Sequence, residues 1–135
     1  MIMTVADRGT NEIETLARRA ALIARGAQIE DVSASESASA GTVRLSLPEV
    51  LDRLGRREVN ELWVEAGPRL AGALLEQSLA DELLLYVAPK LLGPTARSLA
   101  DIAEVRELKD APRLTIIETQ PMGEDLRLRL RCAAS

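Results

Sequence analysis

Apolar residues recur along the chain with two different periods. A spacing of three to four residues predicts amphipathic helices over residues 11–26 and 46–55, and a third helix that begins at Pro68. The first two helices start at an Asn or a Ser followed three residues later by Glu, a pattern that satisfies free amides at a helix start. Gly26 and Gly55 are well placed to end these two helices.

Short apolar runs next to these helices predict strands. Residues 1–6, 27–29 and 62–64 are brief runs, and residues 83–88 are an unbroken one. Continuous hydrophobicity is typical of a strand that is buried on both faces, so we expect 83–88 to be a central strand. Because helix and strand alternate through the middle of the chain, we expect parallel pairing with right-handed crossovers.

The pattern changes in the last third of the chain. Residues 114–117 predict a strand, residues 123–125 a turn, and residues 126–131 alternate leucine with arginine. This predicts an antiparallel hairpin with one leucine face and one arginine face. The arginines either hold a phosphate or form a solvated face balanced by acids such as Glu118, and the second interpretation is favoured because strand pairs commonly carry opposite charges across from each other.

Residues 32–42 lack any period and consist mostly of Ser, Ala and Gly. This composition predicts a surface loop. A mobile lid over a site is the alternative, and a plain connector is favoured because such composition is commoner in connectors.

Composition and charge exclude several classes of function. The 135 residues are 1% aromatic and carry a formal net charge of −4, so neither base stacking nor a basic nucleic-acid surface is expected. The absence of histidine excludes Ser-His-Asp and Cys-His catalysis and imidazole metal ligands within the chain, and no metal site is expected. A single cysteine, Cys132, and the lack of an apolar run of about 18 residues predict a cytoplasmic protein without a membrane span, with residues 1–135 as one domain.

The stretch that follows the 62–64 run carries the candidate chemistry. Glu65 comes directly after the run, and Gly67 and Pro68 turn the chain into a helix. The amides at a helix start lack intrahelical partners and lie at the positive end of the helix dipole, so they favour an anion such as phosphate. Lys90 and Arg97 flank a later loop and either add positive charge for such an anion or are solvated loop cations, which is the favoured interpretation.

Several motifs of the chain occur in the order and spacing of a known family: VEAGP at 64–68, LAG at 70–72, DEL at 81–83, APKLLG at 88–93, DAP at 110–112 and GEDL at 123–126. Through them the chain resembles the reductase domain of the bifunctional riboflavin-biosynthesis deaminase-reductase family. The resemblance implies a three-layer α/β/α, dihydrofolate-reductase-like mixed sheet, mostly parallel with a C-terminal antiparallel hairpin. It also implies NADPH as cofactor, 5-amino-6-(5-phosphoribosylamino)uracil as substrate, and a homodimer.

The resemblance also implies roles for single residues. Glu65 matches the family's substrate-contacting carboxylate, whereas no catalytic acid is assigned. Arg69 stands where the family varies, often with Thr, and is a candidate phosphate contact. Gly72 within a helix indicates either close approach of a backbone or ligand, or tight packing of the helix on a sheet. The family's NADPH-contacting turn and helix start match Gly67, Pro68, Arg69, Leu70, Ala71, Gly72 and Ala73.

The chain departs from the family pattern on its N-terminal side. An early strand with a Ser-Leu-Asp-Gly-like motif, further cofactor contacts, most substrate-phosphate contacts and the zinc-binding deaminase domain have no counterpart in it. The chain therefore resembles the C-terminal portion of the reductase domain, with one wall of the site. One alternative is a non-catalytic folding and dimerisation fragment built on the 114–131 hairpin. A generic nucleotide-binding domain is less favoured because no GxGxxG loop is present.

Overall fold

The computed structural model describes residues 1–5, 12–35 and 44–133. The chain divides into two compact units, Met1–Leu62 and Trp63–Ser135, and each is described by itself. Most of the loop predicted over residues 32–42 lies outside the described residues. Among the helices that the structure describes, none has the length and apolar character needed to cross a membrane.

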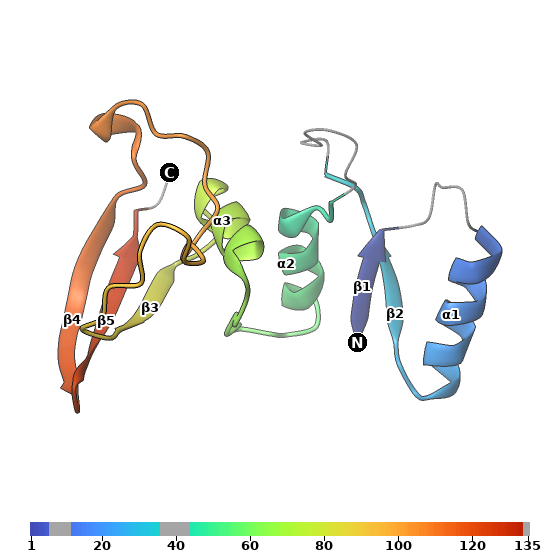
Figure 1. Cartoon of the computed structure of the whole chain (residues 1–135). Helices are drawn as coiled ribbons and strands as arrows, with labels where there is room; N and C mark the ends of the chain where they lie inside the picture. The colour runs from blue at the N-terminus through green and yellow to red at the C-terminus, as the bar shows by residue number, and fades with distance from the viewer. Residues whose placement is uncertain (6–11, 36–43, 134–135) are drawn as a thin grey trace. The chain divides into compact units, whose positions relative to one another are not determined.

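The first unit contains a β–α–β segment followed by a helix. β1 (Ile2–Val5) and β2 (Ile29–Val32) pair in parallel, with α1 (Glu12–Ala24) between them in the chain and α2 (Leu47–Gly55) after them (Figure 1). Both predicted helices are therefore confirmed. The strand expected at 27–29 instead begins at residue 29, because Arg25 and Gly26, the latter with a φ of 86°, form the turn after α1, and residues 27 and 28 follow it without regular structure.

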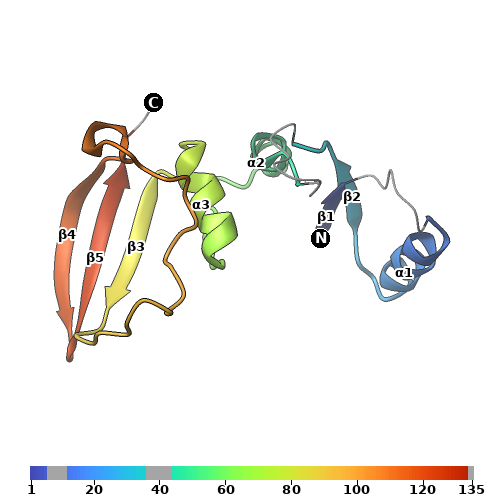
Figure 2. The same cartoon turned by 45° about the horizontal axis from the view of Figure 1, so that its top comes forward.

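The second unit contains one helix and a three-stranded antiparallel sheet. α3 (Pro68–Glu76) precedes β3 (Glu82–Val87), a 3-10 turn η2 (Leu108–Asp110) and the hairpin of β4 (Leu114–Met122) and β5 (Asp125–Cys132). Figure 2 shows β5 between β3 and β4, as the strand order β3-β5-β4 requires. The hairpin closes through Gly123 at a φ of 66°, a conformation that glycine adopts at little cost. The predicted hairpin is confirmed.

The leucines of β5 lie on one face of this sheet. Leu83 lies opposite Leu130 and Leu85 opposite Leu128, and directly opposed residues of antiparallel strands point to the same side. Ile116 of β4 lies opposite Leu130 from the other flank. Leu130 is therefore enclosed by neighbours on both strands and is 7% exposed. The core of the second unit is centred on this leucine.

Two strand predictions are wrong. Residues 62–64 form no strand, and 83–88, expected to be a central parallel strand, forms the edge strand β3, which pairs antiparallel with β5. The described strands make one parallel and two antiparallel pairs, so the expected predominance of parallel pairing is not found in them. The position of a strand in a sheet depends on which other strands pair with it, and the hydrophobicity of the run itself does not determine this. Within the described ranges, β3 has one neighbour.

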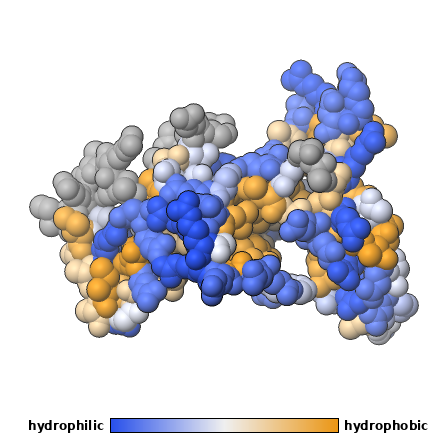
Figure 3. All heavy atoms as spheres, turned by 180° about the vertical axis from the view of Figure 1, so that it is seen from behind, coloured by the Kyte–Doolittle hydropathy of each residue, from blue (hydrophilic) through white to orange (hydrophobic). Residues whose placement is uncertain are grey.

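Apolar side chains reach the surface of both units (Figure 3). Among the described residues, the buried apolar side chains are Val32 and Leu130. Trp63 is 74% exposed, and Leu91, Leu92 and Leu108 are exposed as well. Many apolar side chains that the sequence pattern predicts to be buried are therefore exposed among the described residues.

Candidate functional site

The candidate anion site lies at the start of α3. Gly67 is the cap residue, with φ −74° and ψ 171°, and Pro68 occupies the first turn as the sequence predicts. Gly67 provides no side chain to bond the first amides, and the first turn contains no acidic residue. Arg69 lies exposed in that turn. A cation at the positive end of a helix is unfavourable without an anion nearby, so this turn is electrostatically suited to one.

Glu65 lies two residues before the cap. Its side chain is exposed, in a segment without regular secondary structure. The sequence argument placed it at the end of a strand over 62–64, and that premise is corrected because no such strand forms. Glu65 is close to the α3 turn in the sequence. Its part in substrate binding stays a prediction.

Gly72 packs against a loop of its own unit. It is buried, and a Cβ atom built on it would lie 2.6 Å from the carbonyl carbon of Asp101. The Asp101 amide donates a hydrogen bond to the Pro68 carbonyl oxygen at 2.9 Å. Close approach of a backbone therefore explains the glycine at this position. The backbone that approaches belongs to a loop, and not to a sheet as the alternative explanation predicts. Only the glycine within a helical pattern signals this contact in the sequence.

Two depressions lie on the second unit away from the α3 start. The larger, of about 560 Å³, is lined by residues such as Glu76, Ile102 and Arg106, and the smaller, of about 260 Å³, by residues such as Leu75 and Cys132. Neither includes residues 65–73. Lys90 and Arg97 are exposed in the loop after β3 and line neither depression, which fits their interpretation as solvated loop cations.

The arginine face of the hairpin is balanced by carboxylates. Arg127 donates to Glu118 at 2.5 Å, and Arg129 donates two hydrogen bonds to Glu82 at 2.6 and 3.1 Å. The hydrogen bond from Arg129, assisted by the charges of Arg129 and Arg131, lowers the pKa of Glu82. The interpretation of these arginines as a charge-balanced face is confirmed, and that of a phosphate grip is not favoured.

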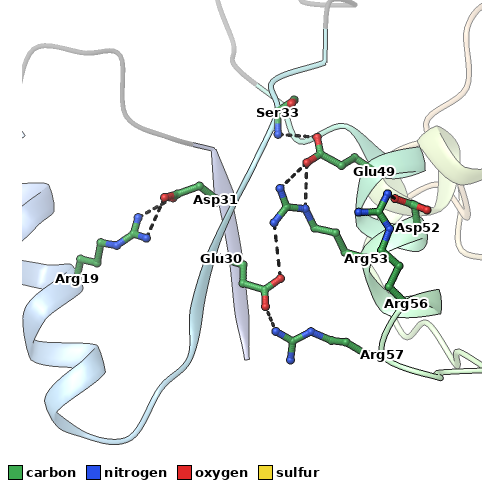
Figure 4. A network of polar contacts seen from close by, with 9 residues as sticks. All are labelled: Arg19, Glu30, Asp31, Ser33, Glu49, Asp52, Arg53, Arg56 and Arg57. Atoms are coloured by element: carbon green, nitrogen blue, oxygen red, sulfur yellow. Dashed lines mark hydrogen bonds and ion pairs between the residues drawn. The ribbon is translucent and has the colours of Figure 1, made fainter.

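A second polar network lies within the first unit (Figure 4). Arg53 of α2 bonds Glu49 at 2.6 Å and pairs with Glu30 of β2 at 3.7 Å, and Arg57 also pairs with Glu30. The mixed signs on the charged side of this helix predict a solvated face. Arg53 and Arg57 remain partly exposed, at 32% and 43% of their side chains, and both also pair with Glu30 of β2. The network ties α2 to β2.

Glu49 has two structural roles in that network. Its amide donates to the Ser46 hydroxyl at 3.4 Å, which confirms the predicted helix cap, while its carboxylate accepts from the Ser33 amide at 2.8 Å. The hydrogen bonding from Ser33 and then from Arg53 lowers the pKa of Glu49 to about 2. Across the described ranges, no group of three His, Cys, Asp or Glu residues is placed to hold a metal ion. The carboxylate of Glu49 links the backbone after β2 to α2.

Comparison with known proteins gives a consistent result. The model of the RibD C-terminal domain family matches residues 2–128. The chain is 45% identical over 82 residues to the riboflavin biosynthesis protein RibD of Haemophilus influenzae, covering 61% of this chain and 22% of that protein. It is 37% identical over 87 residues to a 5-amino-6-(5-phosphoribosylamino)uracil reductase of Buchnera aphidicola, covering 64% of this chain and 42% of that protein.

The fold is also found among solved structures. The chain superimposes on RibD of Acinetobacter baumannii with a TM-score of 0.74 at 24% identity, covering 98% of this chain and 37% of that one. This likeness shows a mixed α/β fold with parallel and antiparallel strands. The chain spans less than half the length of each of these relatives.

Proposed function

Since the chain belongs to the RibD C-terminal domain family, we propose that it forms part of an NADPH-dependent 5-amino-6-(5-phosphoribosylamino)uracil reductase of riboflavin biosynthesis. The name of the Buchnera relative supports the substrate class, although that protein extends well beyond the matched residues. The observation that carries the proposal is the start of α3. Its uncapped turn, with an exposed Arg69, is suited to the phosphates of a dinucleotide.

The proposed cofactor contacts are the segment from Gly67 to Ala73. Of this segment, the amides of the first turn and the guanidinium of Arg69 have the donor chemistry that a phosphate requires. Gly72, buried against the Asp101 backbone, supports the segment from behind. When bound, NADPH supplies a hydride, and the residues of this chain hold it in place.

The proposed role of Glu65 is to orient the substrate. An exposed carboxylate accepts hydrogen bonds from hydroxyl and amino groups, both of which the aminouracil substrate offers. Its position two residues before the α3 cap puts it close in the chain to the proposed cofactor turn. We assign no proton transfer to it.

We also place the protein in the cytoplasm. Its one cysteine, Cys132, is half-buried, and burial, with the charges of Asp81 and Glu82, raises the pKa of this thiol. A thiol kept protonated is a poor nucleophile, which fits a structural residue in a reducing compartment.

A second candidate function is a non-catalytic folding and dimerisation fragment. β4 is an edge strand with exposed apolar residues, Leu114 and Ile116, and such edges pair readily with another chain. A homodimer formed through this hairpin is compatible with a working or an absent cofactor site. The two candidates are therefore separated by binding, not by oligomeric state.

NADPH titration of the 135-residue chain tests the proposal. We expect saturable binding in the micromolar range and about tenfold weaker binding for Arg69→Ala, because a charge-assisted contact to phosphate is lost. Arg97→Ala is the matched control and should bind as the parent does. Glu65→Gln should weaken binding of the aminouracil substrate more than binding of NADPH. A dimer that binds no NADPH would instead support the fragment interpretation.

A further inference from the structure

A loop of the second unit is fastened along the length of α3. Residues 98–103, here called the strap, contact the helix at its first residue, its middle and its last residue. The Asp101 amide bonds the Pro68 carbonyl at 2.9 Å, the Asp101 carbonyl lies against Gly72, and the Ala103 amide bonds the Glu76 carboxylate at 2.5 Å. Three contacts along a nine-residue helix define both its position and its rotation.

The middle contact requires glycine. A Cβ at position 72 would lie 2.6 Å from the carbonyl carbon and 3.0 Å from the amide nitrogen of Asp101, both of which are backbone atoms. Backbone cannot rotate away as a side chain does, so a methyl group there would displace the strap or the helix. Glycine costs about 1 kcal/mol relative to alanine in a helix interior. The close packing of the strap against the helix, which glycine alone permits here, offsets this cost.

The strap also has internal support. The Ser98 hydroxyl donates to the Asp101 carboxylate at 2.5 Å, which holds the side chain of the residue whose backbone touches both Pro68 and Gly72. At the other end, Glu76 accepts from a backbone amide, and an acceptor on a helix side chain is a specific anchor for an otherwise irregular loop. The strap is therefore held to α3 through Asp101 and Ala103, and Ser98 supports Asp101 from within the strap.

We propose that the strap is a positioning element for the first turn of α3, and that Gly72 and Glu76 are positioning residues for cofactor binding. This inference rests on the proposed function, because it takes the α3 start to be the cofactor-phosphate site. Pro68, which the strap bonds directly, precedes the amides that would meet the phosphate. Loosening the strap leaves those amides free to shift, and a shift of about 1 Å is enough to weaken a positioned contact severely.

Variants of Glu76 can distinguish a positioning role of the strap from direct contact with the cofactor. It lies eight residues after Pro68, about 12 Å along the helix axis, so its side chain is remote from a phosphate at the helix start. Glu76→Ala removes the acceptor for the Ala103 amide, whereas Glu76→Gln keeps a carbonyl oxygen that accepts the same hydrogen bond. An effect of the alanine variant that the glutamine variant rescues must pass through the strap.

The experiment combines NADPH titration with limited trypsin digestion of the full chain, since Arg97 and Arg106 flank the strap. We expect Gly72→Ala to raise the Kd for NADPH about tenfold and Glu76→Ala about threefold. Both should speed cleavage at the strap, and Glu76→Gln should match the parent in both measurements. Gly55→Ala is the control substitution, because a Cβ atom built on Gly55 has no atom within 4 Å.

The outcomes distinguish the inference from the function on which it rests. If the parent chain binds NADPH while Glu76→Ala frees the strap and leaves the Kd unchanged, the positioning role is overturned and the proposed function stands. If the parent binds no NADPH, the proposed function fails and the inference fails with it. Should Gly72→Ala not fold, the Glu76 pair alone decides. As a reciprocal readout, NADPH should slow cleavage of the strap in the parent chain.

Discussion

Each of the two units of this chain is stabilised by a different kind of internal contact. In the first, α2 is tied to β2 by Arg53 and Arg57, which share Glu30, and Val32 is buried, with 2% of it exposed. In the second, β5 lies between two antiparallel partners and buries Leu130 beneath leucines of its own sheet. The antiparallel sheet meets its own hydrogen-bonding needs locally. The parallel pair depends more on neighbouring elements.

The fate of the apolar runs shows the consequence of this difference. Residues 126–131 form a strand because a two-residue turn delivers their partner strand directly. Residues 62–64 are at least as apolar but form no strand within the described chain. A parallel strand needs a partner brought from far away in sequence, and hydrophobicity alone does not supply one.

The largest expected effect comes from removing the two buried side chains. Leu130→Ala should destabilise the second unit by about 2–4 kcal/mol through lost contacts and a cavity. Val32→Ala should destabilise the first unit by about 2 kcal/mol, since a smaller side chain is truncated. Hydrogen exchange resolved along the chain during denaturant titration measures each unit separately. If either variant loosened both units equally, the units would be one cooperative block and the comparison would fail.

The matched control for Leu130 is its opposite residue on β4. Ile116 shares the face of Leu130 but is 63% exposed, so Ile116→Ala should change stability by about 0.5 kcal/mol. A cost equal to that of Leu130→Ala would mean that the exposed edge of β4 is covered in solution, which would favour the dimerisation candidate.

Features of the fold that depend on local chemistry were predictable from sequence. Ser46 caps α2, Pro68 opens α3, Gly26 follows α1, and the Leu-Arg alternation forms a hairpin. Each of these signals lies within a few residues of the feature it predicts. The position of residues 83–88 was not predictable in this way, because whether a run is central or at an edge depends on strands elsewhere in the chain.

The candidate site divides along the same line. The turn at Gly67 and the exposure of its first amides follow from local sequence, and the structure has this turn. The strap contacts of Gly72 and Glu76 join residues about 27–29 positions apart, and no local pattern marks Asp101 or Ala103 as their partners. The sequence signal for this contact is Gly72, a glycine within a helix. A glycine at such a position therefore indicates that a long-range contact exists, but it does not identify the residue that makes the contact.

A smaller effect is expected from the ion network of the first unit. Arg53→Ala should destabilise that unit by about 1 kcal/mol, because Glu30 and Glu49 each lose one of their two partners. Arg56→Ala, at the C-cap of the same helix and paired with Asp52 in solvent, should have little effect. The difference between the two variants should shrink as salt is raised, since salt screens exposed charges. The second unit should not respond, and a response there would contradict the division into separately stabilised units.

The smallest effect is expected from pH, and it also separates the units. The pKa of Glu49 is lowered from its usual 4.5 to about 2, so its contribution to stability is present above pH 4.5 and is lost as the pH falls towards 2. Glu49→Gln keeps an acceptor for the Ser33 amide but removes the titrating charge, and should flatten the acid loss of stability in the first unit only. Glu82→Gln should do the same for the second unit, since the pKa of Glu82 is lowered by Arg129. Unfolding of each unit followed from pH 6 to pH 2 checks this. If both variants changed the same unit, the carboxylates would be coupled across the chain, and ion pairing could no longer be treated as a local property of each unit.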